Sequence, residues 1–404
     1  MWEHQADAVR IFLNSKHGIL EMATGTGKTM TAICIMRQLF MQNEIRQSVI
    51  VTYGNDLLEQ WYKEILLRLP DVNVYRWFGS YNEFARFQLC SNQKKILLLS
   101  RIGERVRGVF DKLEAGADTE AVRNETFVLF DEVHGAGSRD FRDRMTGILP
   151  KYRYCLGLSA TPIREFDDTG NQFLKDNIGP VIYTFGIEDA IKRGILCEFR
   201  YIPLSYSLTA DEKHKKKKII AAYEAMKKQG KDFQEEDMYR ELARINKLAV
   251  NKIPEFESFI SLHSEILENC IIFVETKEYG LEVQKVLLEN FYSFHTYYGE
   301  DGYQNLIRFA KGQIQCLITC KKISEGIDIK AVRNIVMFSA DRGHLVTTQR
   351  IGRSLRRNPE EPGKKACVVD FVLEGKNAEW DDITADAERS VWLKKLSEIR
   401  RTEK

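Results

Sequence analysis

A glycine-rich run near the start of the chain has the residue types that bind a phosphate chain. Residues 18–21 form a short apolar segment before it, and residues 30–41 carry apolar side chains at helical spacing after it. Between a strand and a helix, Gly25 and Gly27 let backbone N–H groups close around phosphate oxygens, which the helix dipole also attracts. We therefore predict a nucleotide-binding loop made of Thr24, Gly25, Thr26, Gly27, Lys28 and Thr29.

The side chains of this loop suit a nucleotide bound with a metal ion. Lys28 would reach the β- and γ-phosphates, and the hydroxyl group of Thr29 would bind Mg²⁺, which prefers oxygen ligands. Met22 stands where this phosphate-binding pattern usually has its first glycine. A glycine turn that binds nothing is therefore the alternative interpretation.

A pair of carboxylates further along the chain would complete a site for nucleotide hydrolysis. Asp131 and Glu132 directly follow residues 126–130, an apolar run of the kind that forms a buried strand. In such a site Asp131 would bind Mg²⁺, and Glu132 would orient and deprotonate the attacking water. Acidic residues also cap helices, but their position after a glycine-lysine-threonine loop favours hydrolysis.

Two later runs contain hydroxyl and guanidinium groups that could serve the same site. Residues 154–158 lead as a further strand into residues 159–161, for which a turn capped by a hydroxyl group is the alternative. Gln349 begins a run that ends in several arginines. Arg353 and Arg356 are three residues apart, so on a helix both would project from one face. Arginines that reach a γ-phosphate raise hydrolysis about 10³-fold or more, whereas most arginine-rich helices only face solvent or contact phosphate.

Short apolar runs that alternate with helical patterns must position these residues. This alternation predicts an α/β fold with two parallel-sheet lobes. In the first lobe we predict strands at 18–21, 48–52, 95–100, 126–130 and 154–158. In the second lobe we predict strands at 201–208, 271–274, 294–298, 316–319, 334–338 and 366–371.

The second lobe differs from the first because a helical insertion interrupts it and a tail follows it. We place the first lobe at residues 1–195 and the second at residues 196–372, with a lysine-rich helical insertion at about 210–267 and a polar helical tail at 373–404. The insertion contains the run His214-Lys215-Lys216-Lys217-Lys218. A solvated helix face is one explanation of this charge, and a basic patch that follows a phosphate backbone is the other.

Composition excludes several classes of protein. The 60 basic and 58 acidic residues among 404 give a net charge of +2, so the whole chain is not a polycation. The eight cysteines are scattered without a C-x-x-C pair, which predicts reduced structural thiols and neither disulfides nor a zinc site. No signal peptide and no apolar run of about 20 residues is present, so we expect a soluble, cytoplasmic protein.

Taken together, the motifs resemble those of superfamily 2 helicases over about residues 2–371. The resemblance implies two RecA-like lobes that hydrolyse ATP with Mg²⁺ between them. It implies that Gln5 binds the adenine and that Gly326 and Asp328 bind the nucleotide from the second lobe. It assigns catalysis to Lys28, Asp131, Glu132, Gln349, Arg353 and Arg356.

The same resemblance assigns residues that couple hydrolysis to a nucleic acid. The coupling residues would be His134, within Asp-Glu-Val-His, and Ser159, Ala160 and Thr161. The residues in contact with nucleic acid would be Thr52, Tyr53, Thr276 and Thr319. For the last of these, the strict spacing of the motif falls on Cys320.

The residues found in three of these motifs narrow the resemblance to one group of superfamily 2 helicases. Met-Ala-Thr-Gly-Thr-Gly-Lys-Thr, Ser-Glu-Gly-Ile-Asp and Gly-Arg-Ser-Leu-Arg-Arg look like those of XPB-like and UvsW-like DNA helicases and of type I and III restriction motor subunits. This implies an ATP-dependent helicase or translocase on duplex or branched DNA, with a separate nuclease or target-recognition subunit as a candidate partner. An RNA helicase, an ATP-gated regulatory subunit with little turnover and a P-loop kinase are the alternatives.

Overall fold

The computed structural model describes most of the chain, namely residues 1–90, 93–116, 118–164, 167–229, 235–298, 304–320, 332–340, 344–357, 361, 363–374 and 382–402. Within these ranges, the side chains of residues 236, 344–346, 353 and 382–385 are not described. The chain divides into two units, residues 1–190 and the described residues from 191 onward, which we call the first and second lobes.

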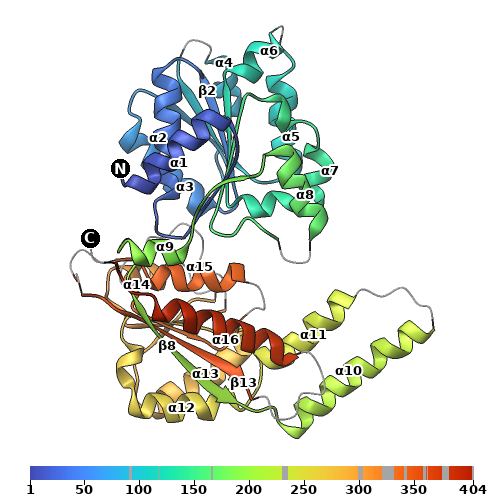
Figure 1. The fold of residues 1–404 in the computed structure, drawn as a ribbon, viewed down its shortest axis with the longest axis vertical. Helices are drawn as coiled ribbons and strands as arrows, with labels where there is room; N and C mark the ends of the chain where they lie inside the picture. Colours follow the sequence, from blue (N-terminus) through green and yellow to red (C-terminus); the bar gives the residue numbers. More distant parts are fainter. Residues whose placement is uncertain are drawn as a thin grey trace. The chain divides into compact units, whose positions relative to one another are not determined.

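A seven-stranded parallel sheet is the centre of the first lobe (Figure 1), with the order β3-β4-β2-β5-β6-β1-β7. Its strands are β1 (His17–Met22), β2 (Gln47–Thr52), β3 (Asn73–Trp77), β4 (Lys95–Ser100), β5 (Thr126–Asp131), β6 (Tyr154–Ser159) and β7 (Val181–Phe185). The inner strands are apolar on both faces because helices cover both sides of the sheet.

The helices of the first lobe form two groups. Figure 1 shows α1 to α3 on one side of the sheet and α5, α7 and α8 on the other. The helices are α1 (Glu3–Ser15), α2 (Lys28–Met41), α3 (Asn55–Arg68), α4 (Phe84–Leu89), α5 (Gly103–Leu113), α6 (Thr119–Asn124), α7 (Arg139–Met145) and α8 (Asp168–Asn177), and α9 (Ile187–Lys192) crosses the boundary between the two units.

The second lobe contains a six-stranded parallel sheet with the order β10-β11-β9-β12-β13-β8. Its strands are β8 (Phe199–Tyr206), β9 (Cys270–Phe273), β10 (His295–Thr296), β11 (Cys316–Thr319), β12 (Asn334–Met337) and β13 (Ala366–Leu373). Its helices are α10 (Ala210–Lys228), α11 (Glu235–Lys247), α12 (Lys252–Leu262), α13 (Lys277–Glu289), α14 (Gln304–Ala310), α15 (His344–Ser354) and α16 (Asp382–Glu398). Among the described helices, none has the length and apolar character needed to cross a membrane.

The lysine-rich insertion begins with a pair of helices, which we call the arm. Figure 1 shows α10 and α11 side by side and projecting from the rest of the second lobe. The next helix, α12, packs against β8 and α13 instead of extending the arm. The predicted tail contains α16, which packs on β13 and β8, so this helix is built into the second lobe.

The predicted α/β class with two parallel sheets is confirmed. All five strands predicted in the first lobe are present, and the lobe has two further strands that were not predicted, β3 and β7. These two strands are the edges of the sheet, and most of their residues are half-buried or exposed. Edge strands lack the continuous apolar run that identifies buried strands, so this signal could not find them.

Candidate nucleotide site and nucleic-acid contacts

The strands of the first lobe bring the predicted catalytic residues to one edge of the sheet. Glu21 of β1 is paired with Ser159 of β6, and Asp131 of β5 is paired with Leu158 of β6. The glycine-rich loop, Asp131 and Ser159 therefore follow neighbouring strand ends. In parallel α/β sheets, ligands bind at this carboxyl edge.

The glycine-rich loop has the backbone that the sequence predicts. Gly25 and Gly27 have φ angles of 88° and 87°, values that side chains other than glycine rarely adopt. Gly27 is the N-cap of α2, and Lys28 and Thr29 follow in its first turn. Lys28 is partly exposed, and its Nζ donates to the carbonyl of Met22 over 3.2 Å. A phosphate at the start of α2 would meet both this cation and the end of the helix dipole.

Two side chains of α1 contact the backbone of the glycine-rich loop. The ring of His4 lies with Nε2 2.9 Å from the carbonyl oxygen of Thr26, and it stacks on Phe185 at 4.1 Å. The amide of Gln5 donates to the same carbonyl over 3.2 Å and accepts from the backbone N–H of Trp2. Both side chains are buried, so Gln5 shapes the loop, while its contact with adenine stays a prediction. No motif in the sequence pointed to His4.

Asp131 is a buried carboxylate with defined partners. The indole Nε1 of Trp61 donates to its Oδ2 over 2.8 Å, and the backbone N–H of Glu132 donates to its Oδ1. Burial raises the pKa of Asp131, and the positive charge of Lys28 and the bond from Trp61 oppose that rise. Trp61 comes from α3, which the sequence analysis did not connect with this site.

Glu132 has an unusual backbone conformation beside this carboxylate. Its φ angle is 49°, in the left-handed region that non-glycine residues seldom occupy. The guanidinium of Arg101 donates to its carbonyl oxygen over 2.9 Å. Because Arg101 N also bonds to the carbonyl of Thr52, this residue connects the ends of β2 and β5. No motif in the sequence pointed to Arg101.

The predicted coupling residues are in contact with one another. His134 Nδ1 lies 3.5 Å from Glu132 Oε2 and 3.2 Å from the hydroxyl of Ser159. The backbone N–H of Thr161 donates to the same hydroxyl over 3.1 Å. Ala160, between them, is buried. A continuous chain of contacts therefore runs from the predicted base to residues 159–161.

The predicted nucleic-acid contacts are not all accessible. Thr52 and Thr319 are fully buried, and Thr319 donates to the carbonyl of Tyr297. Neither hydroxyl can contact a backbone phosphate in this conformation, which corrects the prediction for these two residues. Tyr53, by contrast, is 66% exposed. Thr276 is half-buried and caps α13 by accepting from the N–H of Tyr279.

The predicted residues of the second lobe are described only in part. Gly326 and Asp328 lie outside the described residues, as does the side chain of Arg353. Gln349 lies in α15 and is buried. Helix α15 ends at Ser354, and Arg356 instead forms an antiparallel bridge with Leu196. The prediction that Arg353 and Arg356 project from one face of one helix is therefore wrong.

The first-lobe residues fit a nucleoside triphosphate bound with Mg²⁺. A Cβ at Gly27 would meet the amide of Gln5, and the φ angle of 87° at Gly27 is one that other residues rarely adopt, so the loop depends on a glycine here. Thr29 and Asp131 offer oxygen atoms of the type that Mg²⁺ prefers. Lys28 offers a cation for the phosphates.

Comparisons with known proteins agree with this geometry. Residues 1–164 match the family model described as "Type III restriction enzyme, res subunit", and residues 251–358 match "Helicase conserved C-terminal domain". The chain is 24% identical to the DNA 3'-5' translocase XPB2 of Sulfurisphaera tokodaii, over 92% of this chain and 81% of that relative. It spans 60% and 51% of the length of two further relatives.

Solved structures with the same fold include proteins bound to either nucleic acid. The Type ISP restriction-modification enzyme LlaBIII bound to DNA has a TM-score of 0.65 at 14% identity, and the likeness covers 97% of this chain and 29% of that enzyme. Dbp5 of Saccharomyces cerevisiae bound to RNA and ADP BeF3 has a TM-score of 0.58 at 15% identity, covering 98% and 87%. At these identities the likeness shows two RecA-like lobes and no more.

Proposed function

The chain carries the two-lobed core of the superfamily 2 helicases, and we propose that it is an ATP-dependent motor that moves along or remodels duplex or branched DNA. The observation that carries the proposal is the buried Asp131 next to Glu132, at the sheet edge that also bears the Lys28 loop. The name of the XPB2 relative and the DNA in the LlaBIII structure support DNA as the substrate. We also propose a cytoplasmic location, since none of the eight cysteines forms a disulfide.

The residues of the first lobe have separate tasks in this proposal. Thr29 and Asp131 would hold Mg²⁺, which would neutralise phosphate charge when bound. Lys28 would bind the β- and γ-phosphates of ATP. Glu132 would accept a proton from water while the water oxygen bonds to the γ-phosphorus and the bond to the β-phosphate oxygen breaks.

The residues of the second lobe would complete the reaction. Gly326 and Asp328 would bind the nucleotide, and Gln349, Arg353 and Arg356 would act at the γ-phosphate. Positive charge there stabilises the charge on the transferring group, which in related enzymes is worth about 10³-fold or more. The proposal needs no common helix face, because Arg356 lies beyond the end of α15.

The contacts around His134 support coupling of hydrolysis to DNA. Loss of the γ-phosphate changes the charge next to Glu132, and Glu132 contacts His134, which contacts Ser159. Tyr53 and Thr276 would contact the phosphate backbone of the bound nucleic acid. Such contacts do not depend on the base sequence. A separate nuclease or target-recognition subunit is a candidate partner of such a motor.

ATPase measurements with and without DNA test this proposal. We expect Lys28→Ala and Glu132→Gln each to lower the DNA-stimulated kcat at least a hundredfold. Glu120→Gln and Lys175→Ala are matched controls, since Glu120 is exposed on α6 and Lys175 on α8. The DNA-stimulated kcat of both variants should stay within twofold of the wild-type value. Near-normal turnover in Glu132→Gln would reject the assignment of the base.

An RNA helicase is the second candidate, because Dbp5 is bound to RNA in the structure compared above. Single-stranded RNA, single-stranded DNA and forked duplex DNA, compared at equal nucleotide concentration, separate the two candidates. The DNA proposal expects the largest stimulation from forked or duplex DNA. Stronger stimulation by RNA would favour the second candidate.

A further inference from the structure

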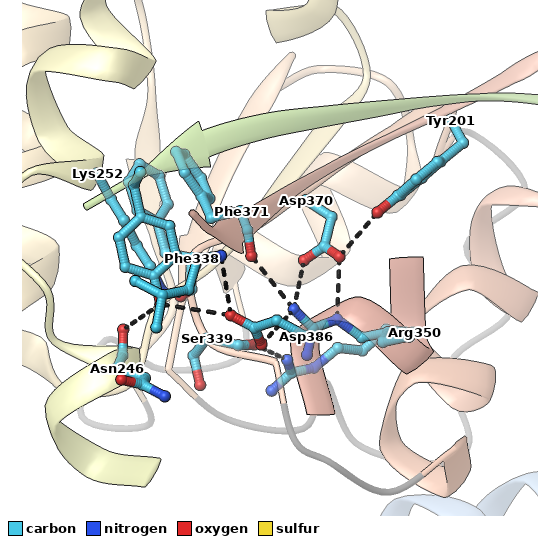
Figure 2. Close-up of polar contacts among 12 residues, drawn as sticks. Tyr201, Asn246, Lys252, Phe338, Ser339, Arg350, Asp370, Phe371 and Asp386 are labelled. Atoms are coloured by element: carbon cyan, nitrogen blue, oxygen red, sulfur yellow. Dashed lines mark hydrogen bonds and ion pairs between the residues drawn. The ribbon is translucent and has the colours of Figure 1, made fainter. Parts of the chain in front are cut away.

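Two buried cations hold the end of β12 in the second lobe. The carbonyl of Phe338 accepts a hydrogen bond from Lys252 Nζ over 2.7 Å, and the carbonyl of Ser339 accepts one from Arg350. Figure 2 shows these residues close together beside Asp370 and Asp386. Lys252 begins α12 and Arg350 belongs to α15, so two helices are fixed to adjacent carbonyl groups.

The side chain of Ser339 continues this connection toward the arm. Its hydroxyl donates to Glu275 Oε2, and the same carboxylate oxygen lies 3.4 Å from Lys247 Nζ. The side chains of Lys247 and Glu275 are only 18% and 28% exposed, so solvent screens this pair less than a surface pair. A chain of contacts therefore runs from Lys247 through Glu275 and Ser339 to Arg350. We call these four residues the relay.

The relay begins at the root of the arm, because Lys247 is the last residue of α11. The root is fixed by several bonds. Thr209 is the N-cap of α10 and forms a capping box with Glu212. The Oε1 atom of Glu212 also accepts a hydrogen bond from the backbone N–H of Val250 over 2.9 Å. Tyr279 OH donates to the carbonyl of Ala249 over 2.8 Å. A displacement of the arm would therefore be transmitted to the second lobe at the root of the arm.

The arm itself presents a basic surface. The side chains of Lys213, Lys215, Lys217 and Lys218 are exposed on α10. A groove of about 800 Å³ lies between α10 and α11, lined by the cations Lys215, Lys218 and Arg244 and by the carboxylates Asp211, Glu212 and Glu241. Apolar side chains such as Ile219 and Ile245 form part of its wall. The basic surface is therefore the exposed lysine face of α10, not the groove. Closely spaced cations on a projecting element suit a phosphate backbone.

We propose that the arm binds the phosphate backbone of a nucleic acid and that the relay carries this contact to α15, the helix of Gln349 and Arg353. Lys247 and Glu275 are positioning residues in this inference, since they act on α15 through Ser339. The inference rests on the proposed function, because it assumes an ATPase that nucleic acid stimulates. It explains why a cation–carboxylate pair lies between the lysine-rich arm and the arginine-rich helix.

The first test separates turnover from binding. Glu275→Gln keeps the shape of the side chain but removes the charge that Lys247 pairs with. We expect its nucleic-acid-stimulated kcat to fall at least fivefold, while the KM for ATP changes less than twofold. Lys247→Met should behave in the same way and Lys247→Arg should retain stimulation. The control is Glu255→Gln, an exposed residue of α12 outside the relay.

The second test addresses the arm. Replacing Lys213, Lys215, Lys217 and Lys218 by Gln should raise the forked-DNA concentration for half-maximal stimulation at least fivefold. Stimulation indistinguishable from wild type in this variant, or in a folded Glu275→Gln, would overturn the inference. If Glu275→Gln does not fold, Ser339→Ala removes only the hydroxyl of the relay and is judged by the same kcat.

The proposed function can fail separately. If neither DNA nor RNA stimulates the wild-type ATPase, the proposed motor is rejected. If nucleic acid stimulates the wild type and stimulates Glu275→Gln to the same kcat, the motor stands and the relay alone is rejected.

Discussion

At the scale of single residues, Asp131 keeps its position because Trp61 donates to it inside the first lobe. The bond is 2.8 Å long and both side chains are buried. Trp61→Phe removes the donor and leaves a buried carboxylate oxygen without it, so we expect a loss of about 1–3 kcal/mol in the free energy of unfolding. Urea denaturation measures this loss.

A double-mutant cycle supplies the control for that prediction. Trp61→Phe also removes part of a core side chain, and this packing loss should persist when Asp131 is replaced by Ala, which has no acceptor for the indole N–H. We therefore expect Trp61→Phe to lower the free energy of unfolding by less in the Asp131→Ala background. Equal costs in both backgrounds would mean that packing, and not the hydrogen bond, explains the loss.

Lys252 gives a prediction that depends on pH. Burial lowers the pKa of Lys252 to about 8, although Asp386 and Asp370 act in the opposite direction. Between pH 8 and the usual lysine pKa near 10.4, the unfolded chain binds more protons than the folded one, so this residue makes stability rise with pH. Between pH 8 and pH 10, the free energy of unfolding of the wild type should rise by about 2 kcal/mol relative to that of Lys252→Met.

The comparison between two proteins is essential to this measurement. Burial raises the pKa of the thiols of Cys197 and Cys367, which lowers stability at high pH, but this effect is the same in both proteins and cancels. Lys311→Met, at an exposed position, is the control and should show no such gain. A constant difference between wild type and Lys252→Met from pH 8 to pH 10 would contradict the prediction.

What the sequence predicted about single residues depends on how local the pattern was. The loop of Gly25 to Thr29 could be predicted because neighbours in sequence build it. His4, Trp61 and Arg101 could not, since each reaches the site from another helix or strand end. The burial of Thr52 was missed for the same reason, because accessibility depends on packing partners distant in sequence.

At the scale of elements, α16 is fastened to the second sheet by a buried ion pair. Arg389 Nε donates to Asp370 Oδ2 over 2.9 Å, and Arg389 also contacts Asp386 and the carbonyl of Phe371. Figure 2 shows Asp370, Asp386 and Phe371 gathered at this point. Breaking such a buried pair leaves an uncompensated charge, so Arg389→Met should cost about 3–5 kcal/mol.

Thermal or urea unfolding checks this value. Lys394→Met, at an exposed position on the same helix, should change stability by less than about 0.5 kcal/mol. Replacing Asp370 by Leu together with Arg389→Met should recover part of the loss, because no buried charge then remains unpaired. Equal stability of Arg389→Met and Lys394→Met would contradict the prediction.

The elements themselves could be predicted where their burial was uniform. The apolar runs of β2, β4 and β5 identified them as inner strands, whereas β3 and β7 were missed at the edges. The sequence placed the polar helical tail at 373–404 after the end of the second lobe, although α16 packs on the sheet of that lobe. The charged residue Arg389 can be buried there because it pairs with Asp370 and Asp386.

At the scale of the whole molecule, each lobe has its own buried core. Phe130 and Phe141 belong to the core of the first lobe, and Phe338 and Phe371 to that of the second. Two separate cores favour two separate unfolding steps. The alternation of strands and helices predicted two sheets, but a pattern that is local along the chain contains no information about how the lobes cooperate.

The cysteines can report the two steps. Cys155 is buried in the first lobe, and Cys197, Cys270, Cys316 and Cys367 are buried in the second. Burial raises the pKa of Cys155 and Cys270, so thiolate is scarce while each core is intact. In pulsed alkylation with iodoacetamide at increasing urea, we expect the four second-lobe thiols to lose protection together and Cys155 at a different urea concentration.

A nucleotide makes this prediction sharper. If the first lobe binds ADP through Lys28, ADP at about 100 times its Kd adds about 2.7 kcal/mol to the stability of the lobe that binds it. The midpoint of Cys155 should then move to higher urea, while the second-lobe thiols move less. Lys28→Ala should cancel the shift. A single midpoint for all five thiols would show that the lobes unfold as one cooperative unit, despite their separate cores.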